Sequence, residues 1–242
     1  MEAGRLVAIQ RLIESRVIRS IEEAKPITRP RLFVGLDAAY SRKYGGVGAA
    51  VIVSEDCSMS KYSLALGQPD IPYIPGLLAF REAPILYAAL YPLLPSIRGA
   101  SAVLFVDGHG VSHPRHTGIA SHMGLALSMP SVGVAKKRLY GREHPFASTC
   151  TVPPCVDGYL LEDGRRIAAI IRTKTGSKIY VSPGAYISLD DAVRLSLACL
   201  GPRRLPAPTY YADRLSKRVA RGLDRGELSP THLQGRLRDY LG

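Results

Sequence analysis

The chain has 242 residues, 46% of them hydrophobic, which is enough for one sizeable core, so we expect a single domain over residues 1–242. Lys and Arg number 32 against 20 Asp and Glu, and the net charge of +12 favours nucleic acid as a partner, with an acidic membrane surface second. No stretch is long and apolar enough to span a bilayer, and the charged N-terminus lacks the core of a signal peptide, so we expect a cytoplasmic location.

The amide and proline content bears on the source of the protein. The chain has no Asn, only three Gln, and 18 Pro. Because Asn and Gln are thermolabile and proline restricts the unfolded chain, this composition indicates a thermophilic source. Melting below ordinary mesophilic temperatures would contradict that expectation.

The four cysteines predict no zinc site, because they form no CxxC pair and have no His at finger spacing: Cys57, Cys150, Cys155 and Cys199. Cys150 and Cys155 could meet across a turn. We interpret them instead as two ordinary small apolar residues.

The first half of the chain predicts a helix, a three-stranded antiparallel unit, a second helix and a fourth strand. Apolar residues recur at helical spacing from Arg5 to Ala24, before Pro26 and Pro30. Three strand-like runs follow, and a polar turn joins the second and third: residues 32–37, 46–53 and 61–66. A proline-rich segment leads to a predicted helix at 77–94 and a strand at 102–107.

The second half predicts alternating short elements. They are a helix near 118–128, strands at 131–134, 156–161, 167–172 and 178–181, and helices at 189–200 and 209–222. The tail at 224–242 is polar and rich in Arg, and is expected to be a short helix or partly disordered. Three antiparallel strands followed by parallel strands predict an α/β fold with a mixed central sheet flanked by helices, the ribonuclease H-like plan.

Two carboxylates end predicted buried strands. Asp37 closes the run from Leu32, and Asp107 closes the run from Ala102 and precedes Gly108-His109-Gly110. A polar strand end is the ordinary role of such an Asp. Two such ends on neighbouring strands instead make a site for a hard divalent cation such as Mg²⁺, which prefers anionic oxygens. A cluster of carboxylates on an otherwise basic protein is the charge distribution of a metal-dependent nuclease.

Glu82 and Asp213 are further candidate carboxylates. Glu82 is either a third metal ligand on the helix that crosses the sheet or a solvated residue of an early helical turn. Asp213 has the same ordinary alternative, a helix surface. Neither assignment follows from sequence spacing.

Cationic and aromatic residues give weaker signals. Four His crowd one segment, and we favour phosphate and scaffold contacts over zinc for most of them: His109, His113, His116 and His122. Lys136 begins a Lys-Lys-Arg run after a strand, either a solvated face or a phosphate contact. Tyr73 lies between Pro72 and Pro75 and is either a rigid wedge or, as chemistry alone favours, a tyrosine of an ordinary loop.

In order along the chain, these motifs resemble those of the endonuclease V (deoxyinosine 3′ endonuclease) family. They are Pro72-Tyr73-Ile74-Pro75-Gly76 with Phe80-Arg81-Glu82, Val106-Asp107-Gly108-His109-Gly110 with His113-Pro114-Arg115, Ala120-Ser121-His122, Gly133-Val134-Ala135-Lys136, Arg172-Thr173-Lys174 and Tyr180-Val181-Ser182-Pro183-Gly184. Two departures are visible. Ala207 stands where the family often has Glu, and the basic stretch after Asp213 matches no family motif.

The resemblance implies a ribonuclease H-like DNA repair enzyme that is expected to be a monomer. It would use Mg²⁺, with Mn²⁺ expected to substitute, to cut the second phosphodiester bond 3′ to deoxyinosine and leave 3′-hydroxyl and 5′-phosphate ends. Inosine in RNA is the alternative substrate. By motif position, Asp37, Glu82 and Asp107 would be metal ligands, and Asp213 a further catalytic residue. Substrate contacts would come from Tyr73 as a wedge, from Gly76, Leu78, Gly108 and Ile119 around the base, and from His113 and Lys136 on the strand.

Overall fold

The computed structural model describes residues 2–147 and 150–230. Its helices are α1 (Ala3–Glu22), α2 (Leu78–Leu90), α3 (Leu94–Ile97), α4 (Ile119–Leu127), α5 (Leu189–Ala198) and α6 (Ala207–Arg225), with a 3₁₀ turn η1 (Tyr91–Leu93) between α2 and α3. Its strands are β1 (Leu32–Ser41), β2 (Gly45–Ser54), β3 (Met59–Gly67), β4 (Ala102–Asp107), β5 (Ser131–Ala135), β6 (Arg142–Pro145), β7 (Cys155–Glu162), β8 (Arg165–Arg172) and β9 (Lys178–Ala185).

The nine strands among the described residues form one mixed sheet in the order β3-β2-β1-β4-β5-β9-β8-β7-β6. β1, β2 and β3 are antiparallel neighbours, β4 and β5 continue the sheet in parallel with β1, and the remaining strands are antiparallel. The predicted mixed, ribonuclease H-like sheet is confirmed. The parallel part is confined to β1, β4 and β5, and the hairpins after β5 widen the sheet.

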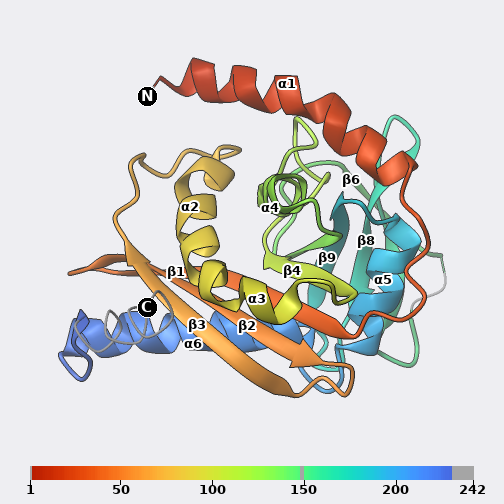
Figure 1. The fold of residues 1–242 in the computed structure, drawn as a ribbon. Coiled ribbons are helices and arrows are strands. Elements are labelled where there is room, and N and C mark those ends of the chain that lie inside the picture. The colour runs from red at the N-terminus through yellow and green to blue at the C-terminus, as the bar shows by residue number, and fades with distance from the viewer. Residues whose placement is uncertain (1, 148–149, 231–242) are drawn as a thin grey trace.

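Helices cover both faces of the sheet, as Figure 1 shows. Side chains alternate across a strand, so neighbouring residues pack into different cores. Phe33 and Phe105 pack edge to face, 5.7 Å between ring centroids, in the core shared with α5 and α6. Val34 and Leu104 pack against α2, α3 and α4 on the other face. None of the described helices is both long and apolar enough to cross a membrane.

Some predicted elements differ from the structure. β1 does not end at Asp37 but continues to Ser41, because β2 pairs with it over that whole length. The helix predicted over 77–94 is interrupted at η1, where Pro92 removes a backbone donor. β6, which consists of exposed residues, was not predicted. In the predicted tail, residues 224 and 225 end α6, and residues 231–242 lie outside the described part.

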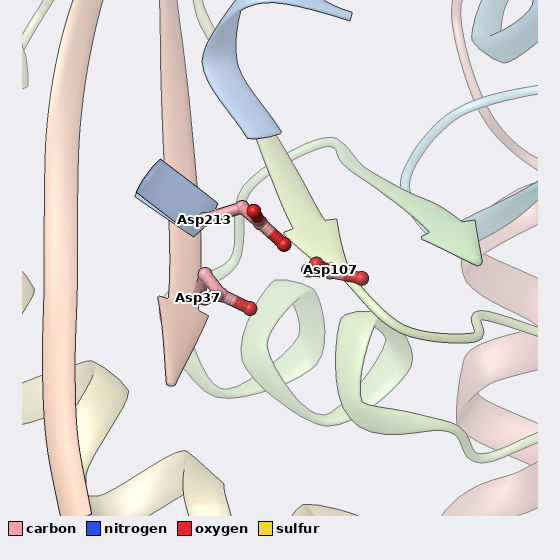
Figure 2. A group of neighbouring side chains, drawn as sticks. All are labelled: Asp37, Asp107 and Asp213. Atoms are coloured by element: carbon pink, nitrogen blue, oxygen red, sulfur yellow. The ribbon is translucent and has the colours of Figure 1, made fainter. Parts of the chain in front are cut away.

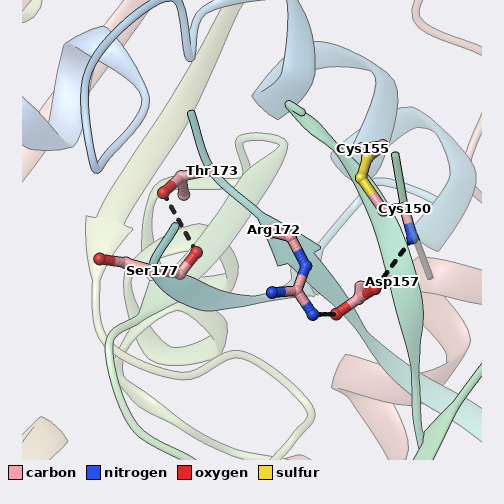
Figure 3. The surroundings of a disulfide bond; sticks show 6 residues. All are labelled: Cys150, Cys155, Asp157, Arg172, Thr173 and Ser177. Carbon is pink, nitrogen blue, oxygen red and sulfur yellow. Dashed lines mark hydrogen bonds and ion pairs between the residues drawn. A yellow bond between two sulfur atoms is a disulfide. The ribbon is translucent and has the colours of Figure 1, made fainter. Parts of the chain in front are cut away.

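The interpretation of Cys150 and Cys155 as separate small residues was wrong. The structure joins them in a disulfide, since the short segment between them returns the chain and leaves their Cα atoms 6.1 Å apart. Nearby, Asp157 accepts a 2.6 Å hydrogen bond from Nη2 of Arg172 and one from the backbone N–H of Cys150, as Figure 3 shows. Arg172 is therefore engaged in an ion pair within the sheet.

His116 connects helix α1 to the hairpin of β7 and β8. Its Nδ1 lies 2.7 Å from Oε1 of Glu14 on α1, and its Nε2 lies 2.5 Å from Oε2 of Glu162 on β7. Burial alone would lower the pKa of His116, but the hydrogen bonds to Glu14 and Glu162 outweigh burial and raise the pKa. The protonated ring thus ties the N-terminal helix to the far side of the sheet.

We expect this connection to stabilise the protein only while His116 is protonated. A histidine whose pKa is higher in the folded state than its unfolded value of about 6.5 contributes fully below that pH, and the contribution is lost as the pH rises through the folded-state pKa. The melting temperature of wild type should exceed that of His116→Ala by more at pH 6 than at pH 9. A difference that does not change with pH would contradict the ion-pair role.

Candidate active site

Three carboxylates from different elements converge at one point of the sheet. Asp37 of β1, Asp107 at the end of β4 and Asp213 of α6 each offer an oxygen atom, and these atoms lie within 4.8 Å of one another. Figure 2 shows the three side chains directed toward one another. The last parallel pair between β1 and β4 is Leu36 with Val106. Asp37 is the next residue of β1, so it lies just past the point where these two strands stop pairing.

Strand alternation and a glycine explain why α6 reaches this point. Phe33, Gly35 and Asp37 lie on the same face of β1, which is the face that α6 covers. A Cβ atom on Gly35 would lie 2.0 Å from the carbonyl oxygen of Pro208 in the first turn of α6. Because Gly35 has no side chain, α6 sits directly on the strand, and Asp213 faces Asp37.

Basic and hydroxyl groups hold the three carboxylates. Nζ of Lys136 donates to Asp107 and, at 2.5 Å, to Oδ1 of Asp213. Nζ of Lys217 also donates to Oδ1 of Asp213, at 2.7 Å, and Oγ of Ser216 donates to Asp37. The site therefore carries both cations and anions, and the cations approach from the strand β5 side and from α6.

The pKa values of the three carboxylates shift in different directions. Desolvation, followed by the charge of Asp107, raises the pKa of Asp37 well above its ordinary value. Desolvation also raises the pKa of Asp107, against the opposing effect of Lys136. Burial pushes the pKa of Asp213 in the same direction, but the hydrogen bonds from Lys136 and Lys217 outweigh it and lower that pKa. Like charges that are crowded together repel one another, and a divalent cation would relieve this repulsion. The carboxylate oxygens are hard donors, so the donor set fits Mg²⁺.

Glu82 lies outside the three-carboxylate group among the described residues. It is 9% exposed on α2, and its Oε1 accepts a hydrogen bond of 3.2 Å from the hydroxyl of Tyr40. Burial raises the pKa of Glu82 to about 7, and the charge of Asp107 acts in the same direction. The structure groups Asp213 with Asp37 and Asp107, while Glu82 lies near enough to Asp107 for the charge of that carboxylate to act on it, so its role as a metal ligand stays a prediction.

A hollow of about 470 Å³ opens beside Asp107. All seven residues expected to contact the substrate line it: Tyr73, Gly76, Leu78, Gly108, His113, Ile119 and Lys136. They come from three stretches of the chain, residues 73–78, 108–119 and 136. Asp107 and Lys136 belong both to this hollow and to the carboxylate group, so the two features form one continuous site.

The carbonyl oxygen of Gly76 fixes one wall of the hollow. It lies 2.9 Å from Nε2 of His113, accepts from Nη2 of Arg115 at 2.8 Å, and accepts from Nε2 of Gln10 at 3.1 Å. Burial lowers the pKa of His113 to about 4, so the ring is neutral at pH 7. Its Nδ1 accepts from the backbone N–H of Arg115, which leaves Nε2 to donate to Gly76. His113 therefore positions the loop that carries Tyr73.

Comparison with known proteins identifies the family. The family model described as Endonuclease V matches residues 14–214. The chain belongs to the endonuclease V family. Endonuclease V of Desulfurococcus amylolyticus is 41% identical over 223 residues, which cover 88% of this chain and 93% of that relative. The crystal structure of endonuclease V from Streptomyces avermitilis is 30% identical, has a TM-score of 0.77, and covers 92% of this chain and 94% of that one.

A more distant structure has the same fold. The crystal structure of Ciona intestinalis endonuclease V, in complex with a 24mer DNA containing an inosine followed by a ribo-adenosine, is 22% identical, has a TM-score of 0.75, and covers 91% of this chain and 98% of that one. Together with the family match, the carboxylate group makes this chain a nuclease with an acidic site suited to a divalent metal.

No sequence motif pointed to Gln10, which the structure places against the wall of the hollow formed by Gly76. It is fully buried on α1, and besides Gly76 it contacts Arg115, whose Nε donates to Oε1 of Gln10 at 2.5 Å. Two features of the sequence could have drawn attention to it. Gln10 is one of only three Gln in the chain, and it lies on an amphipathic helix. It lies four residues before the family match begins.

Proposed function

We propose that this protein recognises deoxyinosine in DNA and hydrolyses the second phosphodiester bond 3′ to it, which makes it a DNA repair enzyme. The observation that supports the proposal is that the hollow and the carboxylate group share residues. Asp107 and Lys136 line the hollow that would receive the altered base, and they also belong to the carboxylate group that would act on the phosphate. One DNA strand can therefore place a base in the hollow and a phosphate at the carboxylates at the same time.

The carboxylates supply the metal site in this proposal. Asp37, Asp107 and Asp213 would hold Mg²⁺, or Mn²⁺ in its place, through hard oxygen ligands. Bound there, the cation supplies an activated water and offsets charge on the phosphate and on the leaving 3′-oxygen. Lys136 presents a cation to a phosphate that approaches the carboxylates, and Ser216 keeps Asp37 oriented toward the site.

Selection of the base would rest on close backbone approach. A Cβ atom on Gly108, whose φ is 152°, would lie 2.5 Å from Cγ2 of Ile119, so only glycine leaves the hollow open there. The backbone groups of that segment are then accessible to the edge of a base. A mispaired base costs less to unstack than a paired one, which also favours the lesion.

Tyr73 is proposed as the wedge that fills the stack after the base leaves. It is 66% exposed at the rim of the hollow, so its ring is free to enter a duplex. We expect Tyr73→Ala to lower the preference for deoxyinosine over adenine about tenfold, with Mg²⁺ dependence retained. Tyr91→Ala, which truncates a tyrosine that is 50% exposed and away from the hollow, is the control. An unchanged preference would remove the wedge role.

The direct test is a gel assay with an end-labelled duplex that carries one deoxyinosine. Cleavage at the second bond 3′ to the lesion, only with Mg²⁺ or Mn²⁺, is the expected result. An adenine duplex should remain intact. A strand with inosine in RNA, assayed in parallel, distinguishes the ribonuclease alternative, because the two substrates differ there only in the sugar. Cleavage that ignores the lesion would overturn the proposal.

A further inference from the structure

The basic stretch of α6 has no assigned role. The family match ends at residue 214, whereas α6 continues to Arg225. Beyond Asp213 the exposed side of the helix carries Arg214, Arg218 and Arg221, and no carboxylate pairs with these three arginines within the described residues. On a solvated helix face we would expect alternating charge signs, with ion pairs along the helix.

This surface adjoins the carboxylate group. A second hollow, of about 390 Å³, runs along α6, and Asp213 lines it together with Tyr210, Arg214, Arg218 and Arg221. Asp107 lines the hollow described above for the base. The carboxylates therefore lie between the two hollows, and Lys136 joins them by contacting both Asp107 and Asp213.

The side chains combine charge with an aromatic surface. The hydroxyl of Tyr210 accepts a 2.8 Å hydrogen bond from Nη1 of Arg214, whose guanidinium also lies 5.6 Å from the ring centroid. The guanidinium of Arg218 makes no hydrogen bond or ion pair with any other described residue. Val219, Ala220 and Leu223 pack the opposite side of α6 against β2 and β3, so the helix presents these groups from a fixed position.

We propose that the α6 basic face, defined as Tyr210, Arg214, Arg218 and Arg221, binds the sugar-phosphate backbone of the DNA strand on the 3′ side of the cleaved bond. The inference rests on the proposed function, since the direction of the strand follows from cleavage 3′ to the base. With the base in the first hollow and the scissile phosphate at the carboxylates, the strand continues along α6. Arginine contacts to phosphate oxygens hold it without reading its sequence.

The test uses the double variant Arg214→Ala/Arg218→Ala and two deoxyinosine duplexes. One duplex continues 3′ of the cut for more than the length of α6, and the other ends just beyond the cut. On the long duplex we expect KM to rise about tenfold or more at 0.1 M salt and kcat to stay unchanged. The slope of log KM against the logarithm of the salt concentration should fall by about two, one for each lost phosphate contact. On the short duplex, variant and wild type should agree.

The matched control is Arg29→Ala/Arg98→Ala. These exposed arginines precede β1 and β4. The first residues of the two strands pair with each other, at the end of the strands opposite Asp37 and Asp107. The control should leave KM on both duplexes unchanged. Arg218→Ala alone, which removes no described contact, repeats the test with one lost contact if the double variant folds poorly.

The outcomes separate the two proposals. If wild type does not cut the long deoxyinosine duplex at all, the proposed function fails. If wild type cuts, but the double variant keeps the wild-type KM, or loses affinity equally for the long and short duplexes, the assignment of the α6 basic face to the 3′ strand is overturned.

Discussion

Replacing Asp107 by Asn is expected to lower the single-turnover rate on a deoxyinosine duplex by about a thousandfold or more, since a bound metal ion contributes several kcal/mol of transition-state stabilisation. Asp107 is the carboxylate that belongs to both the metal group and the base hollow. Asn keeps its shape but removes the anionic oxygen that a hard cation prefers. Binding of the uncut duplex should therefore survive while cleavage is lost.

Stability supplies an independent readout for this variant. Asp107→Asn removes one charge from a set of crowded carboxylates, and Lys136 keeps its contact with Asp213. The melting temperature is expected not to fall. Asp190→Asn is the control, because the Asp190 side chain is 81% exposed and its ion pair with Arg166 spans 4.0 Å. Cleavage by Asp107→Asn at the wild-type rate in Mg²⁺ would remove Asp107 from the metal site.

The sequence predicted the parts of the site that depend on local pattern. Asp107 ends an apolar strand, and alternation places it on the same face as Phe105. Asp37 was predicted at a strand end, yet β1 continues because β2 pairs beyond it. Its position at the edge was still correct, since the neighbouring β4 ends there. Pairing with different partners thus sets where a strand ends and where its side chains become accessible.

The parts that could not be predicted depend on packing between distant segments. Asp213 meets Asp37 only because α6 lies on β1, which is not visible in the residues around Asp213. Glu82, which has the same local signal as Asp213, accepts a hydrogen bond from Tyr40 and feels the charge of Asp107 without joining the three-carboxylate group. Gln10 contacts Gly76 across 66 positions of sequence. Helix surface carboxylates look alike in sequence, and the tertiary contact decides which of them enters a site.

The contact between Gly35 and α6 leads to the second large effect. We expect Gly35→Ala to destabilise the protein by about 3 kcal/mol, because that is the upper end of what overpacking a rigid core typically costs. The added Cβ would lie 2.0 Å from the carbonyl oxygen of Pro208 and 2.8 Å from Cγ2 of Val51. The first neighbour is backbone and has no rotamer to change, so α6 as a whole must move away from β1.

Movement of α6 would also separate Asp213 from Asp37, so the variant should lose cleavage at temperatures where it remains folded. Thermal melting and single-turnover assays well below the melting temperature measure the two effects separately. Gly4→Ala is the matched control, because beyond its chain neighbours and the backbone of its own helix turn no atom lies within 4 Å of its Cβ position on α1. Alanine there should stabilise the helix by up to about 1 kcal/mol. Full activity in folded Gly35→Ala would mean that the carboxylate group does not depend on how closely α6 approaches the sheet.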